Sequence, residues 1–158
     1  YSTELMPMFQ EINHYGKISF QGELKQCLVY MDKLRMNQVI DNIINNSYKY
    51  ANTNIVVTFS ETSETQVKMD AISEERMEEK QVKVQEGICI CIRDFGQGVK
   101  EEEMSFLTEK FYRGDNSSGK NGSGLGLYLS EKFMKDMGGE MLYYNDGGFV
   151  VELFLRKV

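Results

Sequence analysis

Two asparagines and a lysine are spaced so that one side of a helix would carry all three. Asn42 and Asn46 are four residues apart, and Lys49 follows three residues later. An amide oxygen is a hard ligand suited to Mg²⁺, which keeps several waters and takes few protein groups. A lysine ammonium at the end of this row can meet phosphate oxygens. The polar edge of an ordinary amphipathic helix would look the same, so the row needs support from other segments.

A glycine-containing segment at residues 94–99 reads DFGQGV and directly follows a strongly apolar run. Asp94 therefore stands at the end of an expected strand, where its carboxylate can accept a hydrogen bond from an adenine amino group. Gly96 and Gly98 would let a flat base approach the backbone closely. A plain glycine turn would give the same letters, so the segment points to a nucleotide only together with the asparagine row.

A second glycine-rich segment, GSGLGL at residues 122–127, precedes a helical pattern. Backbone N–H groups at a helix start form a natural cradle for phosphate. Between the two segments lies FLTEKFYRGD, where Phe111 is an apolar anchor and Arg113 can reach a terminal phosphate. A P-loop is excluded because Asn121 stands where Ser or Thr would hold Mg²⁺. A Rossmann site is excluded because the third glycine and a βαβ unit are missing.

The elements that must position these residues follow from hydrophobic periodicity. Helices are predicted over residues 2–15, 32–50, 100–107 and 125–137. Strands are predicted over residues 17–21, 26–31, 55–59, 88–93, 140–144 and 149–155. In the helix over 32–50, one stripe faces the core, made of Met36, Ile40, Ile43, Ile44, Ser47 and Ala51. Strands and helices mix without regular βαβ alternation, which favours an α+β sandwich.

Composition and charge restrict the size of the fold and the partners that the sequence allows. The 158 residues, 41% hydrophobic and 27% charged, suffice for one domain with a real core. The net charge of -6 argues against a nucleic-acid partner, and no apolar run reaches the length of a membrane span. Cys89 and Cys91 are two apart in a strand and are interpreted as small core residues, as suits a reducing cytosol. Residues 60–86 are rich in charge and are interpreted as a solvated surface insertion without chemistry.

Four segments in this order resemble the N, G1, F and G2 boxes of the catalytic, ATP-binding (HATPase) domain of bacterial sensor histidine kinases. They are NQVIDNIINNSYKY (37–50), DFGQGV (94–99), FYRGD (111–115) and GSGLGL (122–127). The resemblance runs from about residue 17 to 156 and extends to the wider GHKL superfamily, which includes DNA gyrase. It implies a two-layer α/β sandwich, in which a mixed sheet of about five strands is covered on one face by three helices. Small departures are Arg156 in place of a proline, and Phe149 and Val150 in place of small polar residues.

The resemblance also implies roles for particular residues. Asn46 would bind Mg²⁺, Lys49 and Arg113 would act catalytically on the phosphates, and residues 108–122 would form an ATP lid. Tyr50 would lie against the adenine, and Asp94 would accept its amino proton. The implied nucleotide-binding residues are Asn42, Asn46, Lys49, Tyr50, Asp94, Gly96, Gly98, Val99, Phe111, Arg113, Gly122, Ser123, Gly124, Leu125, Gly126 and Leu127.

Asn42 separates two activities within this superfamily. The gyrase-like members that resemble this chain but hydrolyse ATP carry a glutamate there, as the base that activates water. An asparagine has no useful basicity, so we expect transfer of the γ-phosphate to a protein histidine rather than hydrolysis. The alternatives are a regulatory nucleotide-binding module without transfer activity and an ATP-hydrolysing member. A third alternative is a serine kinase of the anti-sigma-factor type, although such kinases usually keep the glutamate.

The expected acceptor histidine is not found in this chain. The one histidine, His14, lies in EINHYGK, which does not resemble the acceptor motif of the family. We therefore expect a phosphoacceptor and dimerisation domain upstream, with residues 1–16 as the end of its linker helix and residues 17–158 as the catalytic domain. The expected partners are that domain and a response regulator. We expect this domain to be monomeric when isolated, to make no direct membrane contact, and to lie in the cytoplasm as part of a membrane-anchored sensor.

Overall fold

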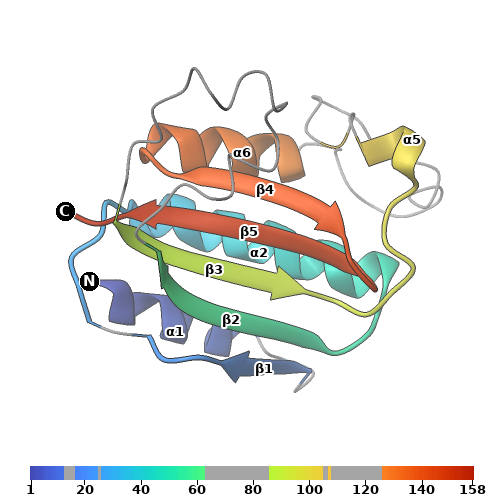
Figure 1. The fold of residues 1–158 in the computed structure, drawn as a ribbon, viewed down its shortest axis with the longest axis horizontal. Helices are drawn as coiled ribbons and strands as arrows, with labels where there is room; N and C mark the ends of the chain where they lie inside the picture. The colour runs from blue at the N-terminus through green and yellow to red at the C-terminus, as the bar shows by residue number, and fades with distance from the viewer. Residues whose placement is uncertain (13–16, 25, 63–85, 105–106, 108–125) are drawn as a thin grey trace, which may run out of the picture.

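Five strands form one mixed sheet, and the helices that share its core lie on one face of it (Figure 1). The computed structural model describes residues 1–12, 17–24, 26–62, 86–104, 107 and 126–158. β1 and β2 run parallel, and the other neighbouring pairs are antiparallel. The predicted α+β fold with about five strands is confirmed. The strands, in the sheet order β1-β2-β3-β5-β4, are β1 (Ile18–Gln21), β2 (Ile55–Thr62), β3 (Gly87–Arg93), β5 (Phe149–Arg156) and β4 (Glu140–Asn145).

The helical elements are η1 (Ser2–Glu4), α1 (Leu5–Glu11), α2 (Lys33–Tyr50), α5 (Glu101–Met104) and α6 (Gly126–Asp136). The long helix α2 begins after Asp32, whose carboxylate accepts hydrogen bonds from two backbone N–H groups of the first turn, at 3.0 and 3.2 Å. It ends before Asn52, whose φ of 50° leaves the right-handed helical region. Within the described residues, no helix combines the length and the apolar character that a membrane crossing requires.

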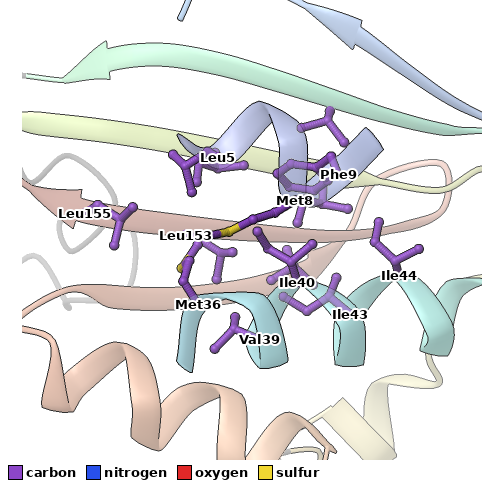
Figure 2. Packing of buried hydrophobic residues seen from close by; sticks show 14 of the residues in the cluster. Leu5, Met8, Phe9, Met36, Val39, Ile40, Ile43, Ile44, Leu153 and Leu155 are labelled. Atoms are coloured by element: carbon purple, nitrogen blue, oxygen red, sulfur yellow. The ribbon is translucent and has the colours of Figure 1, made fainter. Parts of the chain in front are cut away.

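The core lies between the sheet and the helix layer (Figure 2). Alternate residues of β3 point into it, so Ile88, Ile90 and Ile92 are at most 2% exposed. The expected stripe of α2 packs on them, and its apolar members are Met36, Ile40, Ile43 and Ile44, again at most 2% exposed. The predicted stripe from Met36 to Ser47 is therefore the buried face of α2, whereas Ala51 lies just past the helix and is half-buried. The opposite side of the helix carries its polar residues.

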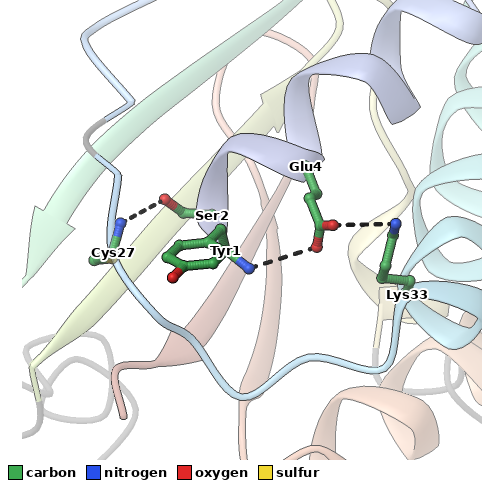
Figure 3. Close-up of polar contacts among 5 residues, drawn as sticks. All are labelled: Tyr1, Ser2, Glu4, Cys27 and Lys33. Carbon is green, nitrogen blue, oxygen red and sulfur yellow. Dashed lines mark hydrogen bonds and ion pairs between the residues drawn. The ribbon is translucent and has the colours of Figure 1, made fainter.

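The first helix is an integral part of this core. Leu5 and Phe9 are fully buried, and the Phe9 ring meets the edges of Phe20 and Phe59 at centroid distances of 6.1 and 6.0 Å. Figure 3 shows the polar contacts that fix the start of this segment: the backbone N–H of Cys27 donates to the Ser2 hydroxyl at 3.1 Å, and the Glu4 carboxylate pairs with Lys33 at 3.1 Å. Residues 2–11 are thus packed into the domain, and the origin of residues 1–16 in a linker stays a prediction.

Some predicted elements differ in extent. The segment 26–31 is not a strand but makes one isolated bridge, between Val29 and Lys157. Its further backbone hydrogen bonds go to Ser2, to Arg156 at the end of β5 and to Val158. β2 runs on to Thr62, since its last residues pair with the beginning of β3. The first predicted helix is a short 3-10 turn followed by α1, and α5 covers four of the eight residues predicted for it. His14, residues 63–85 and most of the predicted lid lie outside the described residues.

The interpretation of Cys89 and Cys91 as core residues is wrong. They do share one face of β3, but it is the face turned away from the helices, because Ile88, Ile90 and Ile92 take the inward positions. Burial against neighbouring strands nevertheless raises the pKa of the Cys89 thiol to about 12, with Glu152 and Cys91 acting in the same direction. At neutral pH both thiols are therefore protonated and weakly nucleophilic.

Candidate functional site

The predicted site residues that the structure describes meet at one end of the sheet. The C-terminal half of α2, the loop after β3, the first turn of α6 and the turn between β4 and β5 contact one another there. Figure 1 shows the end of α2, the end of β3 and α5 on this same side of the molecule. Segments about fifty and eighty residues apart in the sequence are thus brought into a single region by the strand order.

Asn42 links α2 to the first turn of α6. Its half-buried side-chain amide donates to the backbone carbonyl of Gly126 at 3.3 Å and to the hydroxyl of Ser130 at 3.5 Å. The fully buried Ser130 hydroxyl in turn donates to the same carbonyl at 2.8 Å. Because the NH₂ group of Asn42 is directed at α6, a carboxylate at this position would set negative charge against a carbonyl oxygen.

Asn46 lies one helical turn beyond Asn42, and its side chain is half-buried on α2. Its amide oxygen is the kind of donor that Mg²⁺ accepts. Lys49 and Tyr50 continue the same helix, but their side chains are not among the described parts of the structure. The asparagine row expected from the sequence therefore exists on one helix as far as Asn46.

Asp94 is the most buried acidic group of this region, with 3% of its surface exposed. Its Oδ1 accepts hydrogen bonds from the backbone N–H of Gly96 at 3.0 Å and of Phe149 at 2.9 Å. Its own backbone N–H donates to the Phe149 carbonyl at 3.1 Å, which extends the β3–β5 ladder by one residue. No described residue donates to Oδ2.

The loop after β3 is held closely on both sides. A Cβ atom on Gly96 would lie 2.5 Å from the Cβ of Ala51 at the end of α2, so only glycine fits there. In the same segment as Ala51, the Thr53 hydroxyl accepts a hydrogen bond from the backbone N–H of Phe95 at 2.9 Å. On the other side, a Cβ atom on Gly98 would lie 2.4 Å from the Oδ1 of Asn145. Gly98 has φ +74°, a conformation that glycine adopts readily. At Gly96 the loop thus places backbone without a side chain next to the buried carboxylate.

Two further contacts at the site were not predicted from the sequence. Asn145, at the end of β4, pairs with both backbone groups of Val99: its Oδ1 accepts from the Val99 N–H at 2.9 Å, and its amide donates to the Val99 carbonyl. Ser130 supports Gly126 as described above. Asn145 lies in the turn sequence NDGG, where an asparagine is expected for local reasons, so nothing in the sequence indicated a partner 46 residues away.

The remaining predicted residues divide into two groups. Gly126 opens α6, and Leu127 is 7% exposed and packs in the hydrophobic core, so its side chain does not face solvent. The predictions for six other residues lie outside the described part of the chain, namely for Phe111, Arg113, Gly122, Ser123, Gly124 and Leu125.

Comparison with known proteins shows the family and the fold to which this chain is similar. A family model described as histidine kinase-, DNA gyrase B-, and HSP90-like ATPase matches residues 31–158. Among solved structures, the ATP-binding domain of PrrB from Mycobacterium tuberculosis superposes with a TM-score of 0.65 at 21% identity, covering 99% of this chain and 93% of that one. The mycobacterial sensor histidine kinase MprB gives 0.61 at 18% identity, covering 98% and 93%. At such identities the superpositions establish the shared fold.

Two curated relatives are sensor kinases of much greater length. The signal transduction histidine-protein kinase BarA of Escherichia coli (strain K12) is 31% identical over 119 residues, which are 72% of this chain and 11% of that protein. The sensor histidine kinase WalK of Bacillus subtilis (strain 168) is 29% identical over 119 residues, 74% of this chain and 16% of that protein. The chain therefore spans less than a fifth of the length of these relatives.

Proposed function

Since the chain belongs to the family of histidine kinase-, DNA gyrase B-, and HSP90-like ATPases, we propose that it binds ATP with Mg²⁺ and transfers the γ-phosphate to a histidine. The acceptor would belong to a separate phosphoacceptor and dimerisation domain. The domain is of the ATP-binding type found in sensor histidine kinases, and the transfer step and its acceptor are our proposals.

The observation that carries the nucleotide assignment is the hydrogen bonding of Asp94. Two backbone amides hold Oδ1 at 3.0 and 2.9 Å, which fixes the carboxylate in place and directs Oδ2 away from those donors. A buried, fixed acceptor recognises a ligand that brings a donor, such as the adenine amino group, because leaving either partner unpaired costs free energy. Gly96 and Gly98 give a base access to the backbone next to this acceptor.

The proposed metal ligand is the amide oxygen of Asn46. Its chemistry fits Mg²⁺, which binds through oxygen, retains waters and takes further ligands from substrate phosphates. When bound, the ion would neutralise charge that develops on the phosphates during transfer. Asn42 and Asn46 would orient the phosphates and ordered water from α2, while Lys49 and Arg113 are proposed as the cations that contact the transferred group.

Transfer rather than hydrolysis is supported by Asn42. The amide supplies no general base for water, and its NH₂ group is engaged by the Gly126 carbonyl and the Ser130 hydroxyl. Transfer needs a second reactant in place of water, and we propose that a phosphoacceptor domain of the same full-length protein presents it. A response regulator would then receive the phosphoryl group. The cytosol is the proposed location, in keeping with three free cysteines and the use of ATP.

The test has a binding part and a transfer part. Isothermal titration should show one ATP site per chain whose affinity falls when Mg²⁺ is chelated. In the Asn46→Asp variant, ATP affinity and its Mg²⁺ dependence should both change; if both persist, the metal assignment is wrong. With γ-labelled ATP, an added histidine-containing acceptor domain from a relative such as WalK should gain label, and the Asn46→Asp variant should label it much less. Tight ATP binding without labelling of acceptor domains from several relatives would instead indicate a regulatory module.

A further inference from the structure

The side chain of Asn145 makes two hydrogen bonds to the backbone of the loop that follows β3, as a neighbouring β-strand would. Its side-chain oxygen accepts from the Val99 N–H at 2.9 Å, and its side-chain NH₂ donates to the Val99 carbonyl. Both backbone groups of one loop residue are therefore satisfied by one amide side chain. At neutral pH an uncharged amide can both donate and accept in this paired geometry, whereas a carboxylate can only accept.

The turn that carries Asn145 is itself anchored to the end of β3. The guanidinium of Arg93 donates to the Asp146 carbonyl, lies 3.8 Å from the Asp146 carboxylate and covers the Phe95 ring at 4.9 Å. At the other end of the turn, Phe149 exchanges hydrogen bonds with Asp94. Asn145 is thus fixed from both sides relative to the buried carboxylate, so it can act as a rigid support for the loop.

The conformation of Gly98 depends on the same side chain. A Cβ atom on Gly98 would lie 2.4 Å from the Oδ1 of Asn145, and the residue has φ +74°. At Gly98 the loop therefore takes a left-handed backbone conformation and contacts Asn145. The next residue, Val99, then hydrogen-bonds to the Asn145 amide through its backbone. Without the amide, the described residues offer the Val99 N–H and carbonyl no other partner, and the glycine leaves the loop free to take other conformations.

We propose that Asn145 is a positioning residue for the nucleotide base, acting through Val99 to hold the glycine loop against the adenine site. This inference rests on the proposed function, because it assumes that the base lies beside Asp94. It assigns to the β4–β5 turn a part in base recognition that is separate from the phosphate-binding residues of α2. Loss of the amide should weaken the binding of all adenine nucleotides by the same factor. It should leave the Mg²⁺ dependence of ATP binding unchanged.

The Asn145→Asp variant tests the proposal most sharply. The carboxylate keeps an acceptor for the Val99 N–H but faces the Val99 carbonyl with negative charge, and protonation restores a donor. We expect the dissociation constants for ATP and ADP to rise by the same factor, about fivefold at pH 7.5. Relative to wild type at each pH, that factor should fall by at least half as the pH is lowered towards 5. The nearby charged groups are Arg93, Asp146 and Lys100, and the wild-type measurement at each pH accounts for the titration of the nucleotide.

Asn37→Asp is the matched control, since it makes the same charge change at an exposed position in the first half of α2. It should leave both dissociation constants within twofold of wild type. Asn145→Ala should weaken binding at every pH without recovery at low pH. An Asn145→Asp variant that binds like wild type at pH 7.5, loses affinity independently of pH, or discriminates ATP from ADP would overturn the proposal.

Amide hydrogen exchange of Val99 in the nucleotide-free chain separates this inference from the proposed function. In wild type and in Asn145→Asp the Val99 N–H should be protected, and in Asn145→Ala it should exchange at least tenfold faster. If the wild-type chain bound no nucleotide, the proposed function would fail, and so would the role in base positioning, even with Val99 protected. If the chain bound ATP but Val99 exchanged equally fast in wild type and Asn145→Ala, only the inference about Asn145 would fail.

Discussion

The side-chain amide of Asn42 donates a hydrogen bond to the backbone carbonyl of Gly126 across 84 residues of sequence, at 3.3 Å. This contact joins the helix that carries the proposed metal ligand to the start of the helix that would face the phosphates. Asn42, which we expect to correspond to the base of the gyrase-like hydrolases, is here a hydrogen-bond donor to a neighbouring helix. A charged side chain at position 42 should therefore affect both the stability of the fold and the reaction with ATP. The two effects can be measured separately.

We expect Asn42→Asp to lower the free energy of unfolding by about 1–3 kcal/mol. The substitution removes the donor for Gly126 and Ser130 and places a carboxylate beside the Gly126 carbonyl. Urea unfolding at pH 7.5 measures the change. Asn37→Asp, with the same charge at an exposed position, should shift the free energy of unfolding by less than about 0.5 kcal/mol. Equal values for the two variants would contradict the assigned contact.

Ser130→Ala should lower the free energy of unfolding by about 1 kcal/mol, since the fully buried hydroxyl donates to the Gly126 carbonyl at 2.8 Å and accepts from Asn42. Ser19→Ala, at an exposed position of β1, serves as the control. Thermal or urea unfolding of both variants is the measurement. If Ser130→Ala is as stable as Ser19→Ala, the network at the start of α6 contributes nothing to stability.

Asp94→Asn should preserve the fold and abolish much of the ATP binding. The asparagine oxygen can still accept from Gly96 and Phe149, but an NH₂ donor replaces the second carboxylate oxygen. We expect at least a roughly tenfold loss of ATP affinity by titration calorimetry, with a change in unfolding free energy below about 1 kcal/mol. Asp136→Asn removes one charge at an exposed position of α6 and should bind ATP normally. Undiminished binding by Asp94→Asn would remove the adenine assignment.

Gly98→Ala and Gly147→Ala form a matched pair, because both glycines have a positive φ, of 74° and 66°. A Cβ on Gly98 would meet Asn145 Oδ1 at 2.4 Å, whereas a Cβ on Gly147 would meet only the end of the Arg93 side chain at 3.4 Å. Both variants carry the cost of a strained backbone, about 1 kcal/mol, and Gly98→Ala carries the clash in addition. We expect unfolding experiments to find Gly98→Ala the less stable variant, and a reversed order would speak against the contact with Asn145.

The stability of the chain should fall as the pH rises above about 9, in part because of Cys89. Its pKa is raised to about 12 in the folded state, from an ordinary value of 9.0, so between these values the unfolded chain loses a proton that the folded chain keeps. Stability from this group is complete below pH 9 and is lost as the pH rises towards 12. Urea unfolding of wild type and Cys89→Ala between pH 7 and 10.5 measures it. The alanine variant should show a shallower decline, and parallel curves would rule out the contribution of this thiol.

Periodicity predicted the fold well wherever burial decides the structure. The stripe of α2 follows directly from the 3.6-residue period, and the capping role of Asp32 marks where α2 begins. Periodicity could not tell which face of β3 would be covered, and so it misplaced Cys89 and Cys91. It also could not show that residues 26–31 would make an isolated bridge to Lys157 instead of a strand.

The candidate site was predicted as a set of residues but not as a set of contacts. Asn42 and Asp94 were identified by their types and spacing, whereas their partners Gly126 and Phe149 are brought to them only by the tertiary fold. Asn145 has an ordinary turn sequence, and its function in the structure comes from Val99 in the loop after β3. Long-range hydrogen bonds of this kind leave no local signature, because each partner is chosen by the strand order and not by its neighbours in sequence.

The last residue of β2, Thr62, pairs with the first residue of β3, Gly87. Asp94 lies just past the opposite end of β3. Seven residues of β3 separate the Thr62–Gly87 end from the carboxylate, a span of roughly 20 Å in an extended strand. A lengthened or exchanged connection there costs little closure entropy, since that cost grows only with the logarithm of loop length. A fluorophore or affinity label grafted between these two strands would therefore leave the groups of the proposed nucleotide site untouched.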